Sequence, residues 1–206
     1  MQENKTEIKK EAKTPKVKSA KNPMKDIYVD KVVVNIGVGE SGAELEKAVK
    51  ILELVTKTHA VKTKCKVKLP TWGIRPGLPI GCKTTMRGKV AEDFINLTLK
   101  AKKHIIKKKS FSKDGNFSYG IKEYLDVPGV KYDPELGIRG FDVCVSVRRR
   151  GYRIKLRKFK SAKVGKAHLI TKEDSMEFAK EKFKVVVEWV QKINQKDQIL
   201  VKLIRN

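Results

Sequence analysis

The feature of this sequence that most constrains its fold is a two-residue alternation of apolar and polar side chains in several short segments. The alternation runs through "KVVVNI" (31–36), "CKTTMRG" (82–88), "NFSYGIKEYL" (116–125) and "GFDVCVSVRRR" (140–150). Successive side chains of a β-strand point to opposite faces, so each segment predicts a strand with one apolar face and one polar or basic face. Strands of this kind suit a sheet that is covered on one face and accessible on the other.

Three longer segments have the spacing of helices with one apolar stripe. The segment 41–55 opens with "SGAE" and the segment 171–187 opens with "TKED", and both openings have the form of a capping box. The segment 89–106 has the same helical spacing and ends in a cluster of lysines. With the strands, these helices predict an α+β fold in which an antiparallel sheet carries helices on one face and leaves the other face open to a partner.

The periodic segments all lie in one central part of the chain. Residues 1–22 carry seven lysines against three glutamates and show no hydrophobic period, which predicts a flexible basic N-terminal arm. Residues 23–190 are predicted to form a single α+β domain, and residues 191–206 are interpreted as a C-terminal extension. The N-terminus has no apolar stretch typical of a secretory signal, so we expect a cytoplasmic protein.

The charge of the chain is strongly one-sided. Lys and Arg number 48 against 23 Asp and Glu, which gives a net charge of +25 at pH 7. A surface of this charge attracts polyanions, and nucleic acid is the expected partner. A membrane is not an expected partner, because no segment reaches the roughly 18 consecutive apolar residues of a spanning helix.

The residue types that commonly carry catalysis or bind metals are scattered. Cys65, Cys82 and Cys144 form no C-x-x-C pair, and the three histidines lie among lysines without a neighbouring nucleophile and acid. We therefore predict no catalytic residues, no metal site and no cofactor, and we do not expect an enzyme.

One glycine motif favours an alternative interpretation. Gly37-x-Gly39-x-x-Gly42 follows a predicted strand and precedes a predicted helix, as in a dinucleotide-binding fold. That fold needs an acidic residue about 20 positions later to hold the ribose, and residues 57–90 contain no Asp or Glu. The glycines are better explained as turn residues between the strand and the helix.

The polar faces of the predicted strands carry side chains that suit RNA. Lys31 and Asn35 share one face of the first strand, and Lys83, Thr85 and Arg87 share one face of a later strand. Lysine and arginine bind phosphates, whereas Asn and Thr bond ribose hydroxyls and base edges. No helix-turn-helix or zinc finger is present for reading a DNA major groove, so we predict an RNA-binding face. The alternative is a solvated charged surface with no ligand.

Two further segments are basic. "AVKTKCKVK" (60–68) alternates and predicts a strand with lysines, including Lys62 and Lys64, along its outer face. From residue 143 to residue 172 there are eleven basic residues and no acidic one, and we predict that a polyanion lies against this zone.

Four separate blocks of the chain are similar to a known family. They are "NPMKDIYVDKVVVNIGVGES", "GLPIGCKTTMRG", "FSKDGNFSYGIKEYLDVPGVKYDP" and "GIRGFDVCVSV". In this order they resemble the universal large-subunit ribosomal protein family number five, the 5S rRNA binder, and the similarity runs from about residue 22 to residue 187. The segments "PGVKYDP" and "RRRGYRIKLRKFKSAKVGKAHLITKE" resemble the archaeal branch.

The resemblance implies an antiparallel sheet that holds 5S rRNA in the central protuberance of the large subunit. It also implies a loop, here residues 62–74, that reaches P-site tRNA and a small-subunit protein. The family's RNA-contacting asparagine and threonine match Asn35 and Thr85, and its aromatic residue ahead of "I-R-x-G" matches Trp72. Where the family has Gly-Gln-x-Pro this chain has "KTHA" (57–60), so the glutamine's position falls on Thr58.

These arguments predict a non-catalytic RNA-binding constituent of the cytoplasmic ribosome. Its expected partners are 5S rRNA, large-subunit rRNA, P-site tRNA and neighbouring ribosomal proteins. A free-standing RNA-binding or RNA-chaperone module is the alternative. The candidate RNA-binding residues are Lys31, Asn35, Thr58, Lys62, Lys64, Trp72, Arg75, Lys83, Thr85, Arg87, Arg148, Arg149, Arg150 and Arg153.

Overall fold

The computed structural model describes residues 22–188. Its main element is a five-stranded antiparallel sheet with the strand order β2-β3-β1-β6-β5. The strands are β1 (Ile27–Gly37), β2 (Val61–Lys64), β3 (Pro79–Met86), β5 (Phe117–Ile121) and β6 (Phe141–Arg149), and β4 (Ile105–Lys107) forms a separate parallel pair with β7 (Val186–Glu188).

Four α-helices accompany these strands in the described part of the chain. They are α1 (Ala43–Thr56), α2 (Gly88–Ala101), α3 (Arg153–Leu156) and α4 (Lys172–Phe183). Short 3-10 helices occur at Pro23–Lys25, Pro70–Trp72, Lys108–Ser110, Tyr124–Asp126 and Lys166–His168. The predicted α+β fold is therefore confirmed.

One face of the sheet forms the core. β1 is the central strand, and Val34 lies opposite Thr84 of β3 and Val143 of β6, with all three side chains buried. The alternation continues in β5, where Phe117 and Ile121 are buried and the intervening Ser118 is exposed. Burying this apolar face is the main favourable contribution to folding.

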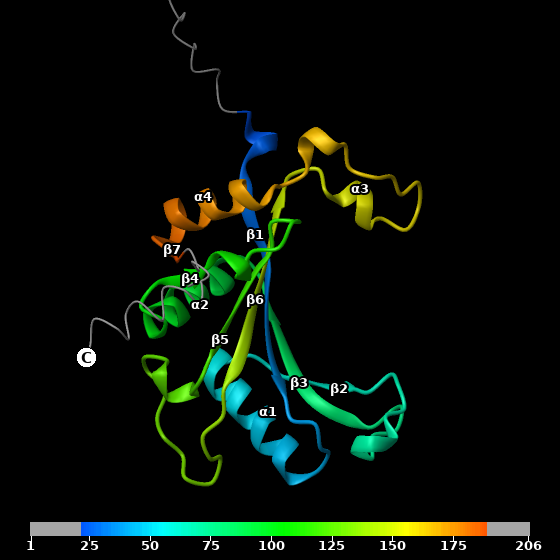
Figure 1. Ribbon diagram of the computed structural model, residues 1–206, viewed down its shortest axis with the longest axis vertical. Coiled ribbons are helices and arrows are strands. Elements are labelled where there is room, and N and C mark those ends of the chain that lie inside the picture. Colours follow the sequence, from blue (N-terminus) through cyan, green and yellow to red (C-terminus); the bar gives the residue numbers. More distant parts are fainter. Residues whose placement is uncertain (1–21, 189–206) are drawn as a thin grey trace, which may run out of the picture.

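The helices cover this apolar face. α1 packs against β3 and α2 packs against β1, and both helices bury one side. In Figure 1, α2 and α4 lie to the left of the sheet, whereas α3 and the connection between β2 and β3 lie to its right. Within residues 22–188, no helical layer covers the opposite face of the sheet. α3 and the connection between β2 and β3 project on that side (Figure 1).

Several element boundaries differ from the sequence prediction. α2 ends at Ala101 because Lys103 and His104 adopt left-handed backbone conformations, which turn the chain into β4. α4 ends at Phe183 in the same way, with Lys184 in the left-handed region, and the chain continues into β7. The two predicted helices were therefore too long at their C-terminal ends.

The two predicted capping boxes have different outcomes. At α4 the box is confirmed, because Thr171 accepts a hydrogen bond from Asp174 N and Asp174 accepts one from Thr171 N. At α1 the prediction was wrong: Gly42 is the N-cap, with φ of 119°, and no side chain of the described residues caps the helix. Glycine is the residue that reaches this conformation without strain.

The strand topology also excludes the dinucleotide-binding interpretation. β1 pairs antiparallel with both of its neighbours, whereas that fold requires a parallel sheet. Of the predicted chain divisions, residues 1–21 of the arm and the whole extension 191–206 lie outside the described residues, as do the last two residues of the predicted domain.

Candidate nucleic-acid interface

The uncovered face of the sheet, called the open face below, carries polar side chains in rows across the strands. In one row, Asn35 of β1 lies opposite Lys83 of β3 and Asp142 of β6. In the next row, Val33 of β1 lies opposite Thr85 of β3. Directly opposite residues of an antiparallel pair have Cβ atoms roughly 5 Å apart, so each row presents its groups side by side.

Two more cations extend the open face toward the end of β3. Lys31 of β1 lies opposite Ser146 of β6, and Arg87 follows β3 directly and is exposed. Within residues 22–188, the side chains of Lys31, Asn35, Lys83, Thr85 and Arg87 form no hydrogen bond or ion pair. Their donors and charges are therefore available to a ligand.

The same face includes polar groups that the sequence analysis missed. Asp142, Cys144 and Ser118 occupy the alternate positions of β6 and β5, between the apolar residues that form the core. Partial desolvation and the charge of the neighbouring Asp142 raise the pKa of the Cys144 thiol, so it stays neutral at pH 7. A carboxylate among these cations accepts hydrogen bonds from base amino groups and disfavours a phosphate next to it.

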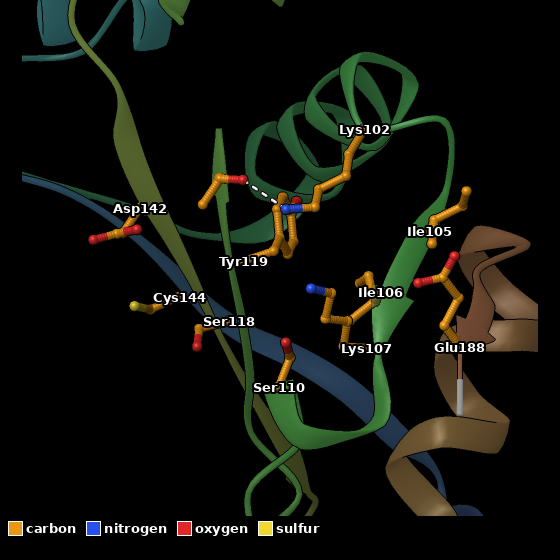
Figure 2. A pocket seen from close by; sticks show the side chains of 11 residues that line it. Lys102, Ile105, Ile106, Lys107, Ser110, Ser118, Tyr119, Asp142, Cys144 and Glu188 are labelled. Carbon is orange, nitrogen blue, oxygen red and sulfur yellow. Dashed lines mark hydrogen bonds between the residues drawn. The ribbon is translucent and has the colours of Figure 1, made fainter. Parts of the chain in front are cut away.

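A hollow of about 500 Å³ lies at the β5 edge of the open face. Figure 2 shows Lys102, from the end of α2, and Lys107, from β4, extending toward β5 and β6, where Ser118 and Cys144 lie. Lys102 Nζ donates a hydrogen bond to Gly120 O at 2.7 Å, which fixes its position. Lys107 forms no such bond to another described residue and adds a cation to this edge.

The connection between β2 and β3 projects beyond the sheet and ends in an exposed aromatic residue. Trp72 is 73% exposed, and Arg75 is exposed as well. Backbone hydrogen bonds close the loop, because Leu69 N donates to Ile74 O at 3.0 Å and Ile74 N donates to Leu69 O at 3.1 Å. The loop therefore holds a large flat side chain and a cation at its tip.

The two candidate lysines of β2 are placed differently from each other. β2 ends at Lys64, so the predicted strand 60–68 was too long, and its lysines do not form one row. Lys62 lies opposite the buried Cys82, on the helix-covered side, and its Nζ is 3.9 Å from Glu46 Oε1 of α1. Lys64 is exposed after an irregularity in the pairing.

Thr58 lies in the short connection between α1 and β2. The Thr58 hydroxyl donates a hydrogen bond to Thr56 Oγ1 at 3.0 Å. The Thr56 hydroxyl in turn lies 3.3 Å from the carbonyl oxygen of Thr58, which accepts a hydrogen bond from it. The side chain is therefore already engaged in closing the end of α1, although it is only partly buried.

The arginines at the end of β6 fall into two groups. Arg148 Nε lies 3.4 Å from Asp30 Oδ2, at a bulge of β1 where the register with β6 shifts. Arg149 Nη2 lies 3.0 Å from Asp174 Oδ2 of α4, and its Nη1 also donates to the carbonyls of residues 168 and 169. Arg150 and Arg153 are exposed and form no ion pair with another described residue.

The carboxylate that meets Arg149 is electrostatically adapted to this contact. Partial burial raises the pKa of Asp174, but hydrogen bonds from Thr171 and the charge of Arg149 outweigh this effect. The net result is a pKa below the ordinary value, so Asp174 is ionised at pH 7. Arg149 and Asp174 therefore fix α4 to the end of the sheet.

Residues 22–188 show neither a metal-binding cluster nor a membrane-spanning helix. No group of three or more His, Cys, Asp or Glu side chains in this range is placed to hold a metal ion. No helix in the same range is long and apolar enough to cross a membrane.

Comparisons with known proteins match nearly all of the described chain. The family model "Ribosomal protein L5" matches residues 22–75, and a second model, for the C-terminus of the same ribosomal protein family, matches residues 79–178. The large ribosomal subunit protein uL5 of Methanosphaera stadtmanae is 44% identical over 167 residues, which are 81% of this chain and 99% of that protein. The uL5 proteins of Sulfurisphaera tokodaii and Archaeoglobus fulgidus are 46% and 45% identical, each over 81% of this chain and over 94% and 93% of their own lengths.

Proposed function

Because the chain belongs to the ribosomal protein L5 family, we propose that its open face binds 5S rRNA. The protein is a structural, non-enzymatic constituent of the large ribosomal subunit. In this proposal the protein attaches 5S rRNA to large-subunit rRNA in the central protuberance. As a ribosomal protein it is located on the cytoplasmic ribosome.

One observation carries the proposal: on the open face, the side chains of Lys31, Asn35, Lys83, Thr85 and Arg87 form no hydrogen bond or ion pair with another residue of 22–188. The row of Lys83, Asn35 and Asp142 offers a cation, an amide and a carboxylate on neighbouring strands. The cation suits a phosphate, and the amide suits ribose hydroxyls and base edges. The wide, shallow minor groove of an RNA helix presents these groups to a flat surface.

A second part of the proposal concerns the connection between β2 and β3. Its tip carries the exposed Trp72 and Arg75, which supply a stacking surface and a phosphate-binding group. We propose that this tip contacts P-site tRNA and a neighbouring small-subunit protein, as the position of the loop beyond the sheet would allow. Trp72→Ala is then expected to weaken tRNA binding to assembled ribosomes without changing the affinity for 5S rRNA.

Competition binding with the full-length protein tests the main proposal. Labelled 5S rRNA is titrated with the protein in the presence of excess tRNA and of an unrelated RNA of matched length. Selective binding of 5S rRNA is expected, and Asn35→Ala and Thr85→Ala should each reduce the selectivity without changing the melting temperature. Equal affinity for all three RNAs would contradict the proposal and favour a general RNA-binding module.

A further inference from the structure

The end of β6, α3 and the segment 166–171 enclose a cleft of about 460 Å³. We propose that this cleft takes an unpaired nucleotide of an RNA, with the base against its apolar wall and the flanking phosphates on its lysines. The inference deepens the proposed function and rests on it, because the RNA on the open face would supply the nucleotide. A cleft of this volume lies within the range of about 300–1,000 Å³ that is usual for ligand sites.

The lining of the cleft has an apolar part and a cationic part. Leu156, Leu169 and Ile170 contribute aliphatic surface, and the ring of Tyr152 also borders the cleft. Lys113, Lys155 and Lys166 contribute ammonium groups, and Asn116 and Thr171 contribute hydrogen-bonding groups. Binding sites for single-stranded nucleic acid combine these elements, namely a positive groove for the backbone and apolar surface for the bases.

The walls of the cleft are held in place before any ligand binds. Tyr152 Oη donates a hydrogen bond to His168 O at 3.1 Å and accepts one from Ile170 N at 3.0 Å. His168 Nε2 lies 2.8 Å from Arg150 O, and its ring meets the Tyr152 ring edge-on at 5.8 Å between centroids. Residues 150–152 are thus joined to residues 168–170, which reduces the conformational entropy that the protein would lose on binding a ligand.

The cations of this segment are not neutralised within the described protein. Between residues 150 and 169, Arg150, Arg153, Lys155, Arg157, Lys158, Lys160, Lys163 and Lys166 form no ion pair with another residue of 22–188. Asp114 is the one carboxylate among the described residues that line the cleft. The surplus of positive charge around an apolar wall is complementary to a phosphate backbone that carries a base.

The cleft continues the open face. Asn116 and Ser146 line both this cleft and a neighbouring hollow that also contains Lys31 and Val33. Asn116 Oδ1 accepts hydrogen bonds from Ser146 Oγ at 3.2 Å and from Val147 N at 3.1 Å, so its amide nitrogen remains to donate to a ligand. An RNA on the open face therefore reaches the cleft without leaving the protein surface.

The composition of the cleft favours a nucleotide over an acidic peptide. A peptide would need backbone or pocket contacts along an extended segment, whereas this cleft of about 460 Å³ is bounded by α3 and the segment 166–171. An unpaired base can fill the cleft with a single planar group, and splayed-out bases are the usual target of sequence-specific RNA recognition. An acidic peptide remains as an outcome that the experiment below distinguishes.

Matched double variants of the full-length protein test the site. Lys155→Ala/Lys166→Ala removes two charges from the cleft, whereas Lys158→Ala/Lys163→Ala removes two charges from the same segment outside it. Fluorescence anisotropy measures the affinity of each for a labelled ten-nucleotide single-stranded RNA and for its duplex. The cleft pair should lose roughly tenfold more affinity for the single strand than the control pair does, and both pairs should lose equally for the duplex.

A second comparison tests the apolar wall. Leu156→Ser removes part of the wall, and Ile154→Ser makes the same kind of change on an exposed residue outside the cleft. With a 4-thiouridine-labelled single strand, photocrosslinks are expected at residues 152–156 or 169–171 and should be lost in Leu156→Ser alone.

Equal losses for both lysine pairs, or crosslinks elsewhere, would overturn the inference while selective binding of 5S rRNA still stood. A larger loss of the cleft pair for a polyglutamate peptide than for the RNA would also overturn it, in favour of an acidic protein segment. Failure of the unaltered protein to select 5S rRNA would instead contradict the proposed function. The two failures can be told apart, because the comparison of single-strand affinities does not depend on selectivity for 5S rRNA.

Discussion

The open face of the sheet and the end of β6 are both rich in cations, but the two regions hold them differently. Lys31, Lys83 and Arg87 on the open face have no acidic partner within residues 22–188. Arg148 and Arg149 at the end of β6 meet Asp30 and Asp174. Whether a basic residue is available to a ligand or stabilises the fold therefore depends on whether a carboxylate reaches it. The charge of its own segment does not decide this.

The largest expected effect concerns the stability of the partnered region. Arg149→Ala removes a largely buried guanidinium together with its contacts to Asp174 and to two carbonyls. We expect a loss of about 2–3 kcal/mol in the free energy of unfolding, measured by urea denaturation. Lys83→Ala, the matched change on the open face, should stay within about 0.5 kcal/mol. Equal stabilities for the two variants would remove the proposed difference between the regions.

The second prediction concerns RNA affinity and the unpartnered region. Lys83→Glu reverses a charge in the middle of the open face and should weaken binding to 5S rRNA by roughly tenfold or more, without a change in melting temperature. Lys180→Glu is the control, because Lys180 is also exposed but belongs to α4, in the helical layer. If both reversals weakened binding equally, the open face would have no special role and only the net charge would matter.

The sequence predicts the part of this contrast that depends on neighbouring residues, and it does not predict the part that depends on residues far apart in the chain. The alternation in β1, β3, β5 and β6 is local, and it correctly predicted both the covered and the open face of the sheet. Arg148 and Arg149 were assigned to RNA contacts together with Arg150 and Arg153. Their acidic partners lie at residues 30 and 174, and no local pattern indicates such distant contacts.

Other differences between the sequence prediction and the structure have similar physical causes. Lys62 was expected on the outer face of a strand, but the pairing of β2 with β3 sets its side chain opposite Cys82, toward α1. Ile105 keeps the helical spacing of α2, yet it belongs to β4, which pairs with β7 about 80 residues later. Asp142 and Ser118 lie on the polar half of the same alternation, so the local sequence already contains the signal that places them on the open face.

The third prediction separates the two regions by their dependence on salt. Each phosphate that a cation neutralises adds about 0.7–0.9 to the slope of log affinity against log salt concentration. Lys83→Ala/Arg87→Ala should therefore lower the slope for 5S rRNA by about 1.5. Arg148→Ala/Arg149→Ala should leave the slope unchanged in the folded protein, since these charges are compensated by Asp30 and Asp174. A lower slope in both double variants would show that the partnered arginines also contact phosphate.

The smallest expected effect concerns pH and the contact between Asp174 and Arg149. Because the pKa of Asp174 is lowered in the folded protein, its contribution to stability is complete above its unfolded pKa of about 4 and is lost as the pH falls through the lower folded value. The side chain is about a third exposed, so solvent screening limits this contribution to roughly 1 kcal/mol or less. The stability difference between the unaltered protein and Asp174→Asn should therefore shrink between about pH 7 and pH 3. Glu177→Gln on the same helix is the control, and its difference should not change in the same way, because Glu177 has no ion pair within residues 22–188. A difference for Asp174→Asn that stayed constant with pH would mean that the carboxylate fixes α4 by its capping hydrogen bonds and not by its charge.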